Sequence, residues 1–162
     1  MIPFMIRNRF GQTVPIVKGF FEQLRKEEGA DLPIGAAGFC WGGKHAFLLA
    51  HGTEINGKPL IDAAFVGHPG ALSLPSDAEK VTLPVSVAVG DNDFQLSEKT
   101  VKKMRTVLEG KPDGMNGEVK IYPGMSHGFC VRASLENGVV EKAAEAEDQC
   151  IAWFDTHFRE ID

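Results

Sequence analysis

Apolar side chains recur along this chain at two spacings. In some segments they fall three or four residues apart, as on one face of a helix, and in others they form short runs bounded by glycine, proline or aspartate. The helical spacing predicts helices over residues 13–28, 44–51, 98–109 and from 139 to near the C-terminus. The short runs predict strands over residues 32–37, 61–67, 81–89 and around 119–121.

Capping and turn residues support these boundaries. Thr13 and Ser97 are suited to N-cap positions, and Gly29 and Gly110 to helix ends. Residues 56–59, Asn-Gly-Lys-Pro, predict a turn. Because strands alternate with helices, we expect right-handed crossovers and a mainly parallel sheet. The sequence holds neither repeats nor a linker, which indicates one α/β domain over residues 1–162.

Composition narrows the class of protein. The 162 residues are 43% hydrophobic and 24% charged, which excludes a disordered tail, a coiled coil and a collagen-like fibre. A net charge of −5 argues against binding to nucleic acid or to an anionic membrane. No apolar run approaches the ~18 residues of a membrane span. The N-terminal residues do not show the basic-then-apolar order of a signal peptide. With three sparse cysteines, we expect a reduced, cytoplasmic protein.

Three polar residues directly follow predicted strands: Cys40, Asp93 and His127. The reactive groups of open parallel sheets gather beyond the carboxyl ends of the strands. A thiol, a carboxylate and an imidazole can serve as nucleophile, orienting acid and base. Their chain order, nucleophile then acid then histidine, is that of α/β-hydrolases. The set therefore predicts acyl transfer through a cysteine.

Cys40 lies in Gly38-x-Cys40-x-Gly42, the pattern of a nucleophile elbow with sulfur in place of oxygen. A sharp turn from strand to helix leaves no room for bulky neighbours, which explains the glycines. The N-terminus of the following helix favours thiolate over thiol, and the backbone N–H of Trp41 would point at a developing oxyanion. The alternative is a buried structural cysteine beside a glycine-rich turn.

The acid and the base each have a competing interpretation. Asp91 lies two residues before Asp93, and Gly-Asp-Asn-Asp is also ordinary turn sequence. His127 is either the base or a solvated loop histidine. His68, which follows another strand, would line the pocket or belong to a loop or cap. No metal centre is expected, because the other histidines lack the carboxylate or third ligand that a zinc site needs.

Three segments together resemble the dienelactone hydrolase family. They are Gly38-Phe39-Cys40-Trp41-Gly42-Gly43, Val89-Gly90-Asp91-Asn92-Asp93 and Tyr122-Pro123-Gly124-Met125-Ser126-His127-Gly128-Phe129. Members of this family are α/β-hydrolases with a Cys-Asp-His triad that open dienelactones or cleave related small esters without a cofactor. The resemblance therefore implies an α/β-hydrolase-like three-layer sandwich and a small ester or lactone as substrate. It assigns the acid to Asp93, and it makes Arg132 a candidate for holding a substrate carboxylate.

The resemblance also implies a domain shortened at its N-terminus. Full α/β-hydrolases begin with further strands, and a loop after one of them supplies a second oxyanion donor. An unpaired sheet edge favours association, so we expect a homodimer or an unstable chain. Two functions stay open: a cysteine-dependent hydrolase, and a weak or inactive hydrolase-like fragment that binds or assembles. A third class of protein also places a cysteine on such an elbow but uses neither an acid nor a histidine with it. That alternative gives no reason for Asp93 and His127.

Overall fold

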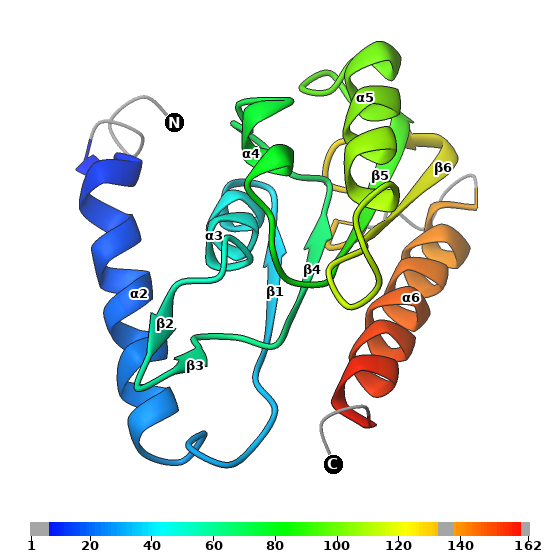
Figure 1. Cartoon of the computed structure of the whole chain (residues 1–162). Coiled ribbons are helices and arrows are strands. Elements are labelled where there is room, and N and C mark those ends of the chain that lie inside the picture. The colour runs from blue at the N-terminus through cyan, green and yellow to red at the C-terminus, as the bar shows by residue number, and fades with distance from the viewer. Residues whose placement is uncertain (1–6, 133–137, 160–162) are drawn as a thin grey trace.

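A four-stranded parallel sheet forms the centre of the computed structural model, which describes residues 7–132 and 138–159 (Figure 1). The strands run in the spatial order β1-β4-β5-β6, and each neighbouring pair is parallel. Their bounds are Gly35–Phe39 for β1, Ala63–Gly67 for β4, Val85–Asn92 for β5 and Glu118–Ser126 for β6. The prediction of a mainly parallel α/β sheet is confirmed.

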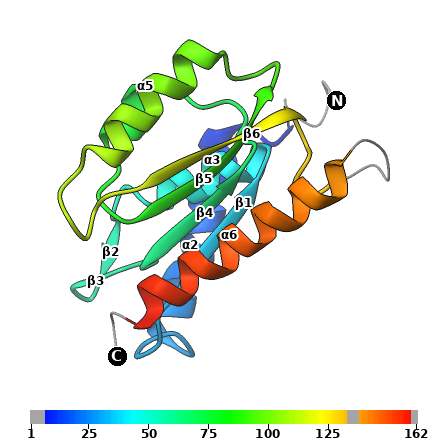
Figure 2. The ribbon, with the colours of Figure 1, turned by 90° about the vertical axis from the view of Figure 1, so that its right-hand side faces the viewer.

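Helices cover both faces of this sheet and make three layers (Figure 2). One face packs against the helices α2 (Phe10–Lys26), α3 (Trp41–Leu49), α4 (Ser76–Glu79) and α5 (Glu98–Glu109). The other face packs against α6 (Val139–Arg159) through a smaller cluster that includes Phe65, Tyr122 and Ala146. β4 is buried along its whole length, because it lies inside the sheet and under helices on both faces. The predicted three-layer sandwich is confirmed.

Some element boundaries differ from the predicted ones. α2 begins at Phe10, and Thr13 is not its N-cap; the Thr13 hydroxyl lies 3.3 Å from the Arg9 carbonyl and 3.2 Å from His45 Nε2. α3 begins at Trp41 rather than residue 44. β5 begins at Val85, because the N–H groups of Thr82 and Leu83 donate to the Ala50 carbonyl at the end of α3.

Other local predictions hold. Ser97 is the N-cap of α5, and its side chain accepts from the N–H of Thr100; Gly110 is the C-cap. The predicted turn is a hairpin between β2 (Glu54–Ile55) and β3 (Lys58–Pro59), with Asn56 and Gly57 both at positive φ. Within the ranges that the structure describes, no helix is both long and apolar enough to cross a membrane.

A buried ion pair fastens the C-terminal end of α2 to the sheet. The Arg25 guanidinium lies 2.6 Å from Asp62 Oδ2, and their side chains are 5% and 16% exposed. The guanidinium also donates to the carbonyls of Pro59, Gly29 and Leu32. Asp62 Oδ2 in turn accepts from the N–H of Ile34, just before β1. One arginine thus joins α2, the turn after it and the starts of β1 and β4.

Replacing Arg25 by methionine should therefore destabilise the protein by about 3 kcal/mol, because the partly buried Asp62 loses its charged partner. The free energy of unfolding measured in urea tests this. Arg159→Met is the control, since its ion pair with Asp155 on α6 is exposed and such pairs contribute little. Equal urea midpoints for the two variants would contradict the role given to Arg25.

Candidate active site

Cys40 alone makes the turn between β1 and α3. Its backbone has φ 51° and ψ −118°, a conformation that is strained for any residue with a side chain. The Cys40 N–H donates to the Gly67 carbonyl at 3.1 Å, and its own carbonyl accepts from the Gly70 N–H at 2.9 Å. The last residue of β4 and the segment that follows it therefore hold the turn in place.

The glycines beside Cys40 are not equivalent. A Cβ on Gly38 would lie 2.4 Å from the Gly42 carbonyl oxygen and 2.9 Å from Ala46 Cβ, so only glycine fits there. A Cβ on Gly42 would meet no atom within 4 Å. The prediction that the elbow excludes side chains is right at Gly38, whereas Gly42 has room for at least a methyl group.

The structure brings Cys40, His127 and Asp93 into one line of hydrogen bonds. Cys40 Sγ lies 3.1 Å from His127 Nε2. His127 Nδ1 lies 2.9 Å from Asp93 Oδ2 and 3.1 Å from Asp93 Oδ1. The Asp93 side chain has no exposed surface and that of His127 is 10% exposed, so this chain is largely shielded from water. A sulfur, an imidazole and a carboxylate in this order are what nucleophilic catalysis through a cysteine requires.

Of the two candidate aspartates, it is Asp93 that contacts His127. Asp91 is exposed, and its Oδ1 accepts from the N–H of Gly124 at 2.7 Å. That contact ties the end of β5 to a sharp turn in β6, where Gly124 has φ 77°. Asp91 therefore shapes the loop that carries His127 and does not touch the imidazole.

Two further residues next to Asp93 also surround His127. The Phe94 ring centroid lies 5.1 Å from that of His127, although 83% of Phe94 is exposed. The Gln95 side-chain nitrogen lies 3.2 Å from His127 Nε2, and the Gln95 N–H donates to Asp93 Oδ1. No motif in the sequence marks either residue as functional; the only signal is their position directly after Asp93 in a turn at the end of a strand.

His68 packs against the other side of His127. Their ring centroids are 5.1 Å apart, and His68 has no exposed surface. Neither ring nitrogen of His68 has a hydrogen-bond partner among the described residues. Burial, together with repulsion from His127, lowers the pKa of His68 from 6.5 to about 4. The ring is therefore neutral near pH 7 and forms a buried wall of the site.

The two predicted binding residues each lie close in sequence to a residue of the candidate site. Trp41 is the first residue of α3, directly after Cys40, and its indole stacks on Phe10 with centroids 5.7 Å apart. Arg132 is exposed, and its N–H donates to the Gly128 carbonyl in the turn after His127. A hollow of about 250 Å³ borders both His127 and Arg132. These positions suit the predicted roles, which stay predictions.

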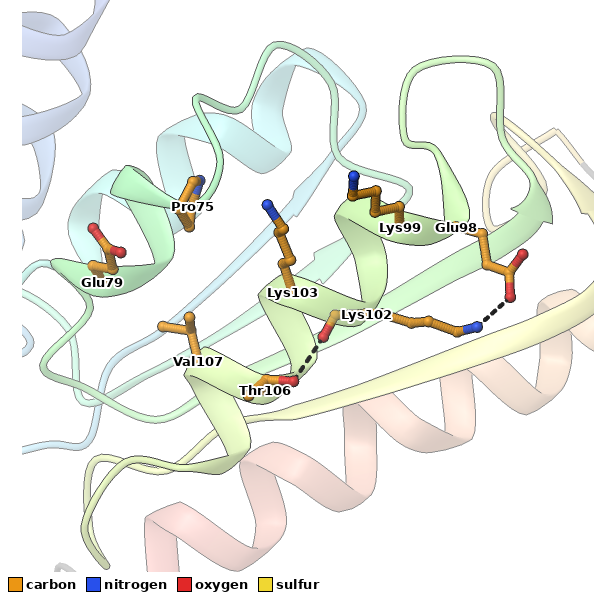
Figure 3. A pocket seen from close by; sticks show the side chains of 8 residues that line it. All are labelled: Pro75, Glu79, Glu98, Lys99, Lys102, Lys103, Thr106 and Val107. Atoms are coloured by element: carbon orange, nitrogen blue, oxygen red, sulfur yellow. Dashed lines mark hydrogen bonds and ion pairs between the residues drawn. The ribbon is translucent and has the colours of Figure 1, made fainter.

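A second hollow, of about 670 Å³, lies between α4 and α5 (Figure 3). Its rim includes Lys99, Lys102 and Lys103, and Lys102 pairs with Glu98 on the same helix. None of the three triad residues lines it. This hollow is therefore not part of the candidate active site.

The unequal glycines lead to a paired prediction. Gly38→Ala should destabilise the protein by about 3 kcal/mol, because its methyl group would overlap the carbonyl of Gly42. Gly42→Ala, inside the first turn of α3, should leave stability unchanged or raise it slightly. Thermal unfolding of both variants measures this, and equal losses would show that the elbow is not packed as described.

The buried His68 leads to a pH prediction. Its lowered pKa means that the unfolded chain binds a proton between pH 6.5 and about 4 and the folded chain does not, so stability should fall as pH drops through that window. His68→Phe should flatten that fall. Burial also lowers the pKa of His45 and His51, but these two histidines contribute equally to the pH dependence of the parent and of His68→Phe. If the curves of unfolding free energy against pH for the parent and for His68→Phe run parallel, the lowered pKa does not belong to His68.

Known proteins that resemble this chain are hydrolases. A model of the dienelactone hydrolase family matches residues 6–158. The hydrolase tropI of Talaromyces stipitatus is 30% identical over 158 residues, which are 95% of this chain and 58% of that protein. A protein of Aquifex aeolicus, provisionally named carboxymethylenebutenolidase, is 24% identical. The match covers 78% of this chain and 52% of the length of that protein. The chain thus spans less than two thirds of these relatives.

Solved structures show the same fold. A provisionally named dienelactone hydrolase from Klebsiella pneumoniae superposes with a TM-score of 0.57 at 28% identity, covering 75% of this chain and 51% of that one. The native esterase Est2 of Thermogutta terrifontis gives a TM-score of 0.65 over 90% of this chain and 64% of its own; at 17% identity it supports the fold alone. The family match spans nearly the whole chain, and the chain belongs to the dienelactone hydrolase family.

Proposed function

We propose that this protein hydrolyses a small lactone or carboxylic ester, with Cys40 as the nucleophile. The observation that carries the proposal is the continuous contact from Cys40 Sγ through the His127 ring to the buried Asp93 carboxylate. The name carboxymethylenebutenolidase, given to relatives, supports a lactone as the substrate class.

In the first half of the reaction, His127 Nε2 takes the proton of Cys40 and the sulfur attacks the substrate carbonyl. Asp93 accepts the Nδ1–H of His127, which leaves the Nε2 lone pair directed at the sulfur and stabilises the imidazolium once it forms. The backbone N–H of Trp41, at the start of α3, would donate to the tetrahedral oxyanion. His127 then gives its proton to the leaving oxygen, and a thioester remains on Cys40.

In the second half, His127 accepts a proton from water while the water oxygen attacks the thioester carbonyl. The carbon–sulfur bond breaks, the acid leaves, and the proton passes to Cys40 Sγ. Both halves use the same imidazole nitrogen, which the structure places 3.1 Å from the sulfur. No cofactor is required for either half.

The proposal predicts selective loss of activity at one cysteine. Cys40→Ala should lower the hydrolysis of an activated phenyl ester by about 10³-fold or more, because no thioester can form. Cys150→Ala should hydrolyse the ester at the parent rate, since this thiol lies on α6 and packs against the apolar cluster that includes Phe65 and Ala146. If Cys40→Ala hydrolyses the ester as fast as the parent, the proposal is wrong.

Thiol labelling gives an independent readout. Burial raises the pKa of Cys130 to about 12 and that of Cys150 to about 11, so both remain thiols at neutral pH. Iodoacetamide at pH 7 should therefore modify Cys40 first, as peptide mass spectrometry would show. Equal labelling of all three cysteines would mean that Cys40 is not activated.

A further inference from the structure

The reactive nitrogen of His127 has a second neighbour. Gln95 Nε2 lies 3.2 Å from His127 Nε2, the same atom that lies 3.1 Å from Cys40 Sγ. With Nδ1–H donated to Asp93, the neutral imidazole has a single lone pair, on Nε2, to accept a proton. The carboxamide and the thiol therefore meet at one acceptor, and the carboxamide meets it from the exposed side.

The position of this carboxamide is set by two other parts of the site. The Gln95 backbone N–H donates to Asp93 Oδ1 at 2.9 Å, which fixes the residue beside the acid. A Cβ on Gly70 would lie 2.8 Å from Gln95 Oε1 and 3.3 Å from Gln95 Nε2, so the missing side chain of Gly70 leaves the space that the carboxamide fills. Gly70 itself donates to the Cys40 carbonyl. The carboxamide thus lies between the loop that supports the nucleophile and the base.

The two halves of the reaction need different partners at His127 Nε2. Before acylation the lone pair accepts the proton of Cys40. After acylation the sulfur has no proton, and the lone pair must accept one from water. The carboxamide can exchange its direct contact with that nitrogen for a contact with water. Because it offers both a donor and an acceptor, it can then hold the water in the orientation that attack requires.

We propose that Gln95 is a positioning residue for thioester hydrolysis: its carboxamide holds the hydrolytic water at His127 Nε2. The proposal rests on the hydrolase function proposed above. It adds that His127 transfers the proton while Gln95 positions the water. The water oxygen bonds to the thioester carbon while His127 Nε2 takes one water proton. The carbon–sulfur bond then breaks and that proton passes to Cys40 Sγ, which releases the acid and restores the thiol.

The test separates the two halves with p-nitrophenyl acetate. In Gln95→Ala, the initial burst of p-nitrophenol, which reports acylation of Cys40, should keep the parent rate. The steady-state rate should fall about 10- to 100-fold, because the water is no longer oriented. Intact-protein mass spectrometry should then show an acetyl group accumulating on the variant. Hydroxylamine, which cleaves thioesters without help from a base, should restore release of the acetyl group.

Two further variants keep the test independent of folding defects. Gly70→Ala retains Gln95 but displaces its carboxamide, so it should accumulate the same acetylated protein. Gln12→Ala, at an exposed glutamine of α2, should match the parent in burst and steady state. Thermal unfolding of all the variants should remain cooperative.

Each other outcome counts against one proposal in particular. A Gln95→Ala variant that turns over like the parent, while Cys40→Ala is inactive, overturns the role of Gln95 and leaves the hydrolase proposal intact. Burst and steady state falling together would also overturn it, since Gln95 would then serve acylation. A parent protein that neither acquires an acetyl group nor releases p-nitrophenol overturns the hydrolase proposal itself, and the role of Gln95 with it.

Discussion

The backbone of Cys40 is the constraint on which the site depends. Its positive φ is unfavourable for cysteine by about 1–3 kcal/mol and persists only because surrounding contacts enforce it. Two hydrogen bonds, one to the last residue of β4 and one from the segment after it, and the absence of a side chain at Gly38 supply that enforcement. These contacts follow from the strand order, because β4 lies next to β1 in the sheet. The turn places Cys40 Sγ within hydrogen-bond distance of His127, above the carboxyl ends of the strands.

The register of β5 and β6 sets where the acid and base meet. Gly90 pairs with Tyr122 and Asn92 with Ser126, so β6 has extra residues opposite β5 at this point. The backbones approach so closely here that a Cβ on Gly90 would lie 2.0 Å from the Met125 carbonyl oxygen. The bulge carries the chain to His127 at the level of Asp93, and the contact of Asp91 with Gly124 holds its outer turn. An acid–base distance of 2.9 Å thus follows from backbone pairing rather than from the aspartate alone.

The sequence predicted what depends on spacing and chain order. All four strands of the sheet, the α5 caps and the three residues following strand ends could be read from periodicity, glycines and turn residues. Phe94, Gln95 and the position of His68 against His127 could not, because their contacts arise between loops that are distant in sequence. Thr13 is similar: a threonine before an apolar helix is a common cap, but here its hydroxyl reaches His45 on α3. Local patterns carried no information about these partners.

His68 shows why a buried polar side chain can suit this position. Neither of its ring nitrogens has a hydrogen-bond partner within the described ranges, and a buried polar group without one costs about 1–3 kcal/mol, which an aromatic hydrocarbon of similar shape would avoid. Yet the ring packs against the His127 imidazole, which in the proposed reaction becomes positive when it takes the proton of Cys40. Burial lowers the pKa of His68 to about 4, so near neutral pH this neighbour carries no charge that would oppose the new one. Only in acid, where His68 itself becomes charged, would the two rings repel each other, and the same step would weaken the fold beneath the triad.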